Sequence, residues 1–325
     1  MLPTSLDNDW GRHLIEVKQC TPEWLRYTFF KKVREMATVA RNGGGNHMHG
    51  KTMIAAFDQP SLRTKVFFQR AMTILGGTVI SADQITHFSD VVSGGEFKDT
   101  IHALMALCPS VIVLRHSEQS RVHEAARILT EERSKAVLIN AGDGADGQHP
   151  TQALADVFTI HYKFKGRGGL RIAVTGNLSG NRAVNSFVYL MAKGPPVEFI
   201  FVSPKSEEGR GRIDEKIREY LNKHHVAFTE ETDLEKVVKL ADVFYVVNTN
   251  DPKIDPKAAE KCHINMGLVL SMKHDAIIMD PLPRSKIEIP LEVDKNKRAV
   301  YQGVQLKCGL WVKMALLVLM LSHKR

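Results

Sequence analysis

The chain has 325 residues, of which 43% are hydrophobic and 25% charged, and its formal net charge is +8. This composition is typical of a soluble globular protein, and the length suggests two domains. The Lys and Arg residues are scattered, with no long basic run and no interleaved aromatic residues, which argues against nucleic acid as a partner. The positive charge instead favours an anionic small substrate or simple solubility.

The four cysteines lie far apart and form no CxxC pair, so we expect neither disulfides nor a structural zinc site. Residues 1–9 are polar and lack the apolar core of a signal peptide. The most apolar run, residues 314–321, is shorter than the roughly 20 residues needed to span a bilayer. We therefore expect a cytoplasmic protein without a membrane partner.

Residues 51–75 predict a buried strand, a turn at Asp58-Gln59-Pro60 and a helix that opens near Ser61. The first N–H groups of a helix have no intrahelical partner and carry the positive end of its dipole. The Leu62 amide, the Arg63 guanidinium and the hydroxyls of Ser61 and Thr64 would make this helix end suitable for a phosphate. The alternative is a capped turn with Arg63 on the surface.

The first half of the chain continues as alternating strands and helices, which predicts a parallel sheet covered on both faces. The expected strands are residues 78–81, 110–114 and 136–140, and the expected helices are residues 23–41, 97–107, 121–133 and 152–164. Ligands collect at the carboxyl ends of such strands. Three polar clusters follow strand ends, and we expect them at one edge of the sheet: residues 61–64, Arg115-His116 and residues 142–152.

A glycine-rich boundary, residues 165–169, separates this series from a second one. Its expected strands are residues 170–175, 197–202, 226–228, 243–247 and 277–279, and its expected helices are residues 181–193, 213–224 and 234–240. Residues 310–322 form an apolar helix that we expect to be buried. The loop 176–182 lacks both the G-x-G-x-x-G spacing and the following acidic residue of a dinucleotide site, which argues against NAD.

Four motifs in this order resemble the aspartate and ornithine carbamoyltransferases, with the aspartate branch the more similar. They are F-D-Q-P-S-L-R-T-K at 57–65, V-L-R-H at 113–116, I-N-A-G-D-G-x-x-G-Q-H-P-T-Q-A-L-A-D at 139–156 and D-P-L-P-R at 280–284. The resemblance extends from about Gly50 to the C-terminus. It implies an enzyme that moves a carbamoyl group from carbamoyl phosphate to a small amine or amino acid, without metal or cofactor.

The same resemblance sharpens the expected α/β fold of two domains, each a parallel sheet flanked by helices. Residues 1–149 together with 304–325 would form the carbamoyl phosphate domain, residues 150–164 a crossover helix, and residues 165–303 the acceptor domain. The resemblance also implies a homotrimer with sites between subunits.

The resemblance further implies roles for individual residues. Ser61, the Leu62 amide, Arg63, Thr64 and Arg115 would hold the phosphate. Thr64, Arg115 and His149 would polarise the carbonyl oxygen, and Gln152 would accept a hydrogen bond from the carbamoyl amide. Pro281 and Leu282 would offer backbone carbonyls to that amide and to the incoming amine. The acceptor would be held by Arg182, Asn248, Asn250 and Leu282, with Arg182 at its α-carboxylate.

Three positions depart from the family pattern. Gly94 stands where the family has a lysine that reaches into the neighbouring subunit's site. Asp90 falls near the position of the family's loop serine, where a carboxylate would repel phosphate. Asn248-Thr249-Asn250 replaces Arg-x-Gln, so the second carboxylate of aspartate loses a guanidinium, at a cost of about 2–5 kcal/mol. Asp280 replaces a histidine, which disfavours a dicarboxylate.

These departures favour a carbamoyltransferase whose acceptor is not aspartate. The alternatives are an ordinary aspartate carbamoyltransferase of pyrimidine synthesis and a catalytically weak paralogue with a regulatory or scaffolding role.

Overall fold

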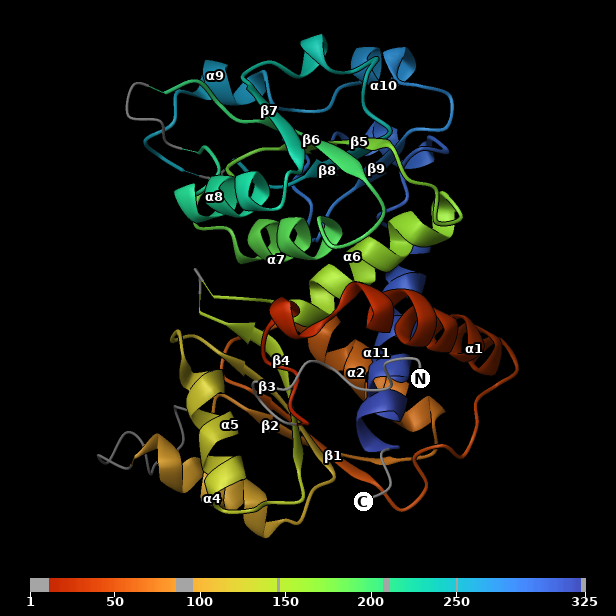
Figure 1. Ribbon diagram of the computed structural model, residues 1–325, viewed down its shortest axis with the longest axis vertical. Helices are drawn as coiled ribbons and strands as arrows, with labels where there is room; N and C mark the ends of the chain where they lie inside the picture. The colour runs from red at the N-terminus through yellow and green to blue at the C-terminus, as the bar shows by residue number, and fades with distance from the viewer. Residues whose placement is uncertain (1–11, 86–95, 145–146, 207–210, 250, 323–325) are drawn as a thin grey trace. The chain divides into compact units, whose positions relative to one another are not determined.

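The protein is described by a computed structural model that covers residues 12–85, 96–144, 147–206, 211–249 and 251–322 (Figure 1). It divides into two compact units. Unit 1 comprises residues 1–155 and 308–325, and unit 2 comprises residues 156–307. Two helices contribute to both units, α6 (Pro150–Lys163) and α11 (Val304–Leu321).

Unit 1 contains a four-stranded parallel sheet in the order β2-β1-β3-β4. Its strands are β1 (Thr52–Phe57), β2 (Thr78–Asp83), β3 (Val111–His116) and β4 (Val137–Asp143). Its helices are η2 (Val17–Gln19), η3 (Trp24–Phe29), α1 (Phe30–Arg41), α2 (Leu62–Ile74), α4 (Phe97–Ala106) and α5 (Arg121–Glu131).

Alternate residues of the strands in unit 1 point to opposite faces of the sheet, so each face is covered by its own helices. Ile54, Ile112 and Leu138 share one buried cluster with Ile101 of α4 and Val122 of α5. Figure 1 shows α4 and α5 on this face and α2 on the other. This covering of both faces is the reason that the two central strands, β1 and β3, contain the continuous apolar runs M-I-A-A-F and V-I-V-L.

Unit 2 contains a five-stranded parallel sheet in the order β7-β6-β5-β8-β9. Its strands are β5 (Leu170–Thr175), β6 (Val197–Val202), β7 (Ala227–Glu231), β8 (Val243–Val246) and β9 (Ile277–Met279). Its helices are α7 (Arg182–Met191), α8 (Glu215–Lys223), η4 (Leu234–Lys236), α9 (Pro256–Glu260), α10 (Met266–Ser271) and η5 (Leu291–Lys295).

The core of unit 2 also lies on both faces of its sheet. Ala173, Phe244 and Ile278 share a cluster with Leu268 of α10 and Val293 of η5. On the other face, the Tyr245 ring stacks on Phe187 of α7 with centroids 4.3 Å apart. Figure 1 accordingly shows α7 and α8 on one side of this sheet and α9 and α10 on the other.

The helix α11 has the length and composition of a membrane span, with a mean hydropathy of 1.7 over 18 residues. The same test is passed by core helices of globular proteins, and 61% of this window is buried inside the molecule. Its consecutive residues Met314–Leu317 are at most 1% exposed. The pattern of burial is that of a core helix, as its composition predicts.

The prediction of two parallel sheets flanked by helices is confirmed, and several element boundaries differ. Arg115 and His116 belong to β3 itself, and β4 extends to Asp143. The prediction of a helix at residues 234–240 was wrong, because only Leu234–Lys236 is helical, and it has 3-10 geometry. Backbone bonds from Val237 N to Leu234 O and from Leu240 N to Val237 O keep this segment in tight turns.

Candidate functional site

The strand order of unit 1 reverses between β1 and β3, and this switch point is where open α/β sheets bind ligands. Phe57 at the end of β1 is paired with Arg115 at the end of β3. His116 is paired in turn with Asp143 at the end of β4. The three polar clusters predicted from the sequence therefore leave the same edge of one sheet.

The first cluster forms the N-terminus of α2. Ser61 is the N-cap with an extended φ of −152°, and its carbonyl accepts the amide of Lys65 at 3.0 Å. Within the described residues, the Ser61 hydroxyl makes no capping bond to the helix, so it and the first amides can serve a bound anion. Thr64 is buried and the Leu62 side chain is 78% exposed, so Leu62 can offer only its backbone.

The second cluster, Arg115, is fixed by its neighbours in the sheet. Its Nη1 donates to the carbonyl of Ala141 on β4 at 3.2 Å, and its own carbonyl accepts from Asp58 N at 2.9 Å. The buried Asp58 carboxylate accepts from the backbone N–H and from the hydroxyl of Ser117. Asp58 thus connects the loops that follow β1 and β3 and holds the two arginine-bearing segments together.

The third cluster contains His149 and Gln152 at the start of α6. The His149 carbonyl accepts the amides of Gln152 and Ala153, each at 3.1 Å, so His149 occupies the position before the helix. Its side chain is 7% exposed, and its Nδ1 lies 3.3 Å from Thr151 Oγ1. All seven predicted residues of the carbamoyl phosphate site in the first half of the chain therefore lie in unit 1.

The predicted acceptor residues lie in unit 2, also beside a switch point. Its strand order reverses between β5 and β8; the loop after β5 leads to Arg182, and the loop after β8 carries Asn248. Asn177 N donates to Asn248 O at 2.9 Å and joins the two loops. Arg182 is the first residue of α7, whose N-cap Asn181 accepts from the amides of Ala183 and Val184. Asn248 is exposed.

The loop with Pro281 and Leu282 is held by buried polar groups. The Asp280 carboxylate, in a residue 5% exposed, accepts from Leu282 N, and Asp280 N donates to Gln305 Oε1 at 3.2 Å. Leu282 has a φ of 59°, an unfavourable value for a leucine. Strained backbone of this kind persists where surrounding contacts impose it, often at functional sites.

Gln305, which accepts from Asp280 N, also contacts Asp156, the last residue of the 139–156 motif. The fully buried Asp156 accepts from Gln305 Nε2 at 2.7 Å and from the Tyr245 hydroxyl at 2.8 Å. Burial and the charge of Asp156 raise the pKa of Tyr245 well above its ordinary value, so this hydroxyl remains a donor. Sequence reasoning assigned no role to Asp156, although it lies within a motif that was already recognised.

A second support in unit 2 was also missed. Glu288 Oε1 accepts from Thr249 N at 2.9 Å and from Thr249 Oγ1 at 2.8 Å, and His263 Nε2 lies 2.9 Å from the same hydroxyl. Burial alone would raise the pKa of Glu288, but hydrogen bonds from Ser285 and Thr249 outweigh it and lower that pKa. The loop after β8 is therefore pinned by an ionised carboxylate. The polar Thr249 between two asparagines was the one signal for it.

Asp90, Gly94 and Asn250 lie outside the described residues. Among the residues that the structure covers, no group of three or more His, Cys, Asp or Glu is arranged to hold a metal ion.

Comparisons with known proteins agree with the two units. Residues 12–162 match the family model for the carbamoyl phosphate-binding domain of aspartate/ornithine carbamoyltransferase. Residues 168–320 match the model for the aspartate/ornithine-binding domain of the same family. The chain is also 35% identical over 315 residues to aspartate carbamoyltransferase 3, chloroplastic, from Pisum sativum, covering 95% of this chain and 77% of the relative.

Solved structures give the same result. The catalytic subunit of aspartate transcarbamoylase from M. jannaschii superposes with a TM-score of 0.84 at 33% identity, covering 96% of this chain and 98% of that one. Aspartate transcarbamoylase from Trypanosoma cruzi, in complex with carbamoyl phosphate and aspartate, gives a TM-score of 0.84 at 27% identity, with 95% of each chain covered.

Proposed function

Because the chain belongs to the aspartate/ornithine carbamoyltransferase family, we propose that it transfers the carbamoyl group of carbamoyl phosphate to L-aspartate. The relatives described above carry aspartate carbamoyltransferase names, and one was solved with both carbamoyl phosphate and aspartate. This support favours aspartate over the unassigned amine that the sequence departures suggest. We therefore adopt the alternative of an ordinary aspartate carbamoyltransferase in place of an enzyme with a different acceptor.

The observation that carries the proposal is the cationic edge of unit 1. The N-terminus of α2 and Arg115 flank the switch point between β1 and β3, and Asp58 connects their loops. A dianionic phosphate would be bound there by helix amides, by the hydroxyls of Ser61 and Thr64 and by the guanidinium of Arg63. Arg115 would complete the site.

The chemistry needs a neutral amine, stabilisation of the oxyanion that forms on the carbonyl, and a leaving phosphate whose charge is neutralised. Thr64, Arg115 and His149 would donate to the carbonyl oxygen as its negative charge grows. Gln152 and the backbone carbonyls of Pro281 and Leu282 would orient the carbamoyl amide and the amine. Catalysis would then rest on positioning and on preorganised charge.

Aspartate is compatible with the acceptor half because the Asp280 carboxylate is turned into its own loop. Its residue is 5% exposed, and the carboxylate accepts from the Leu282 amide. Arg182 would hold the α-carboxylate, and the exposed Asn248 could donate its side-chain amide to the second carboxylate. An amide is a weaker partner than a guanidinium, so we expect a high KM for aspartate.

A different amine acceptor is the second candidate, because two carboxylates lie close to this half of the site. Glu288 and Asp280 are 2% and 5% exposed, and no arginine follows β8. Their charges would favour a neutral or cationic side chain on the acceptor.

We also propose the homotrimer that the resemblance implies. β2 is an edge strand with most of its residues exposed, and it lies next to β1. Val66 and Ile80 in this region are 44% and 37% exposed, which suits contact with a second copy. Light scattering after gel filtration should give about three times the chain mass of 36.4 kDa.

The activity is tested by incubating the protein with carbamoyl phosphate and single amines, and by measuring the carbamoylated product. The panel includes L-aspartate, L-ornithine, and neutral and cationic amino acids. Carbamoylaspartate as the main product supports the proposal, and a different product supports the second candidate. No product from any amine would contradict both and leave a regulatory or scaffolding paralogue.

A further inference from the structure

The N-terminal segment, residues 13–17, lies against β4 and is held there by backbone bonds. Leu14 N donates to Leu138 O at 2.9 Å, and Asn140 N donates to Leu14 O at 2.8 Å. The Asn140 side chain donates to Ile15 O at 2.8 Å and accepts from Gly142 N at 2.7 Å. This segment therefore follows β4 to the point where the strand enters the loop that precedes His149.

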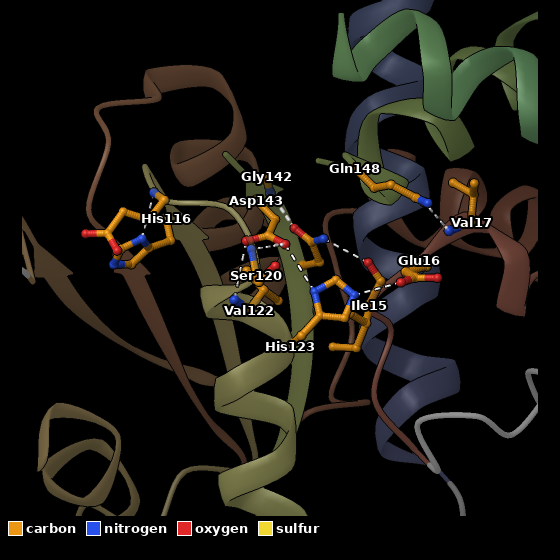
Figure 2. A network of polar contacts seen from close by, with 12 residues as sticks. Ile15, Glu16, Val17, His116, Ser120, Val122, His123, Gly142, Asp143 and Gln148 are labelled. Carbon is orange, nitrogen blue, oxygen red and sulfur yellow. Dashed lines mark hydrogen bonds and ion pairs between the residues drawn. The ribbon is translucent and has the colours of Figure 1, made fainter. Parts of the chain in front are cut away.

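Both ends of that loop are attached to the N-terminal segment. At its far end, Gln148 Oε1 accepts from Val17 N at 2.8 Å, and Gln148 is the residue directly before His149. The loop is closed on itself by a bond from Asp143 N to Gln148 O of 3.3 Å. At its near end, Asp143 is linked to Glu16 through the imidazole of His123 (Figure 2).

His123 lies between two carboxylates from different elements. Its Nδ1 is 3.2 Å from Asp143 Oδ2 at the end of β4, and its Nε2 is 2.7 Å from Glu16 Oε1. Carboxylates only accept hydrogen bonds, so both ring nitrogens donate and the ring is an imidazolium. Lys18 is a further charged group beside this pair, with its Nζ 3.2 Å from Glu16 Oε2.

Besides its contact with His123, the Asp143 carboxylate makes further hydrogen bonds that hold it rigidly in place. It accepts from the backbone amides of Ser120 and Val122 at 3.2 and 3.4 Å. Asp143 therefore caps the N-terminus of α5, although it lies more than 20 positions away in the sequence. Asp143 is 1% exposed. A displacement of the imidazolium would therefore be transmitted to the start of α5 and to the loop that leads to His149.

We propose that His123 is a positioning residue for the carbamoyl transfer, because its imidazolium holds Glu16 and Asp143 together and thereby fixes the loop that places His149. This inference rests on the proposed function in one respect, the role of His149 at the carbonyl oxygen. His123 itself does not contact the substrates.

The link is sensitive to alkaline pH. The hydrogen bonds to Asp143 and Glu16 raise the pKa of His123 to about 9. Loss of the proton leaves one ring nitrogen facing a carboxylate without a hydrogen to donate, so one of the two contacts must open. The placement of His149 is then expected to loosen above about pH 9, whereas the groups at the N-terminus of α2 that are proposed to bind phosphate stay in place.

The test compares His123→Leu and Glu16→Gln with the wild type, and uses His102→Gln, a half-buried histidine of α4 beside Glu132, as the matched control. Glu16→Gln leaves the Asp143 cap of α5 intact, so it separates positioning from folding. We expect kcat to fall between about tenfold and a hundredfold in His123→Leu, with the KM for carbamoyl phosphate within about threefold. The fall in kcat above about pH 9 should disappear in His123→Leu and move to lower pH in Glu16→Gln. His102→Gln should match the wild type.

A readout without substrate separates this inference from the proposed function. The imidazole NMR signals of His123 and His149 are followed against pH in the wild type and in the same variants. The inference predicts that the His149 signal shifts when His123 titrates, and that this response is lost in His123→Leu, whether or not any amine is carbamoylated. Wild-type kcat and pH profile in both variants, or a His149 signal indifferent to His123, would overturn it.

Discussion

The two units present the same topological solution with opposite electrostatics. In each, the predicted residues flank the point where the strand order reverses, between β1 and β3 in unit 1 and between β5 and β8 in unit 2. In unit 1 this point carries Arg63 and Arg115 beside a helix N-terminus. In unit 2 the loop after β8 carries asparagines, and the nearby charges include the buried carboxylates of Glu288 and Asp280.

The difference teaches that the fold fixes where a ligand binds, while local charge decides which ligand it is. The carboxylates of unit 2 serve mainly as internal supports. Glu288 holds the backbone and hydroxyl of Thr249, and Asp280 holds the Leu282 amide. In the proposed function, the donor half would bind a dianion, whereas the acceptor half would rely on Arg182 and neutral amides.

The largest effect is expected from Arg63→Ala, which removes one of the two guanidinium groups proposed to hold the phosphate in unit 1. Loss of a charge-assisted contact of this kind costs about 2–5 kcal/mol, or roughly 30-fold to several thousand-fold in kcat/KM for carbamoyl phosphate. The matched control is Arg70→Ala, which removes an exposed arginine from the same helix. Equal kinetics in the two variants would remove the anion site from α2.

The next largest effect is a dependence of stability on pH. We expect the free energy of unfolding, measured with urea between pH 4 and 9.5, to be greatest near pH 6.5. The folded-state pKa of His123 is raised to about 9, so its contribution is complete below its ordinary pKa of 6.5 and is lost as the pH rises towards 9. Burial, followed by the charge of Arg12, lowers the pKa of His13 to about 4, so its contribution is lost as the pH falls from 6.5 towards 4. Each change amounts to at most about 3 kcal/mol.

This pH dependence also separates the two units. In unit 2, burial lowers the pKa of His263, which contributes only on the acid side. Burial raises the pKa of the Cys262 thiol in unit 2 to about 12, so that thiol costs stability only above its ordinary pKa of about 9. The loss of stability between pH 6.5 and about 8.5 therefore belongs to unit 1 and should vanish in His123→Leu. Persistence of the full alkaline loss in that variant would contradict the assignment.

A smaller effect is expected from Asn248→Arg, which would give unit 2 the guanidinium that it lacks. Because Asn248 is exposed, the longer side chain can be accommodated. With aspartate as acceptor, steady-state kinetics should show a KM for aspartate about tenfold lower and an unchanged KM for carbamoyl phosphate. A higher KM for aspartate would show that the acceptor half does not bind a dicarboxylate at this loop.

The smallest effect is expected from Leu62→Ser. The side chain is 78% exposed and only the backbone N–H is assigned to the phosphate, so stability should change by no more than about 0.5 kcal/mol. The affinity for carbamoyl phosphate should stay within about twofold in a calorimetric titration. A large loss would mean that the leucine side chain itself shapes the site.

The parts of the molecule that could be predicted are those encoded by neighbouring residues. The strand β1, the turn and α2 lie within 25 residues, and apolar periodicity and helix-start signals lie within that stretch. The alternation of strands and helices was likewise sufficient for two parallel sheets. The roles of the individual site residues remain predictions.

What could not be predicted depends on contacts between distant segments. His123 and Glu16 are 107 positions apart, and Thr249 and Glu288 are 39 positions apart. No local pattern marks a carboxylate that supports a loop far away from it in the sequence. The short segment Leu234–Lys236 was mistaken for a longer helix for a related reason, because its buried leucine is held by tertiary packing.

The most direct test of the account is a calorimetric titration of carbamoyl phosphate into the wild-type protein in the absence of any amine. The cationic edge of unit 1 predicts saturable binding of one ligand per chain that inorganic phosphate displaces. Absence of saturable binding at millimolar carbamoyl phosphate, in a protein that remains folded, would contradict the donor site from which the proposed reaction follows.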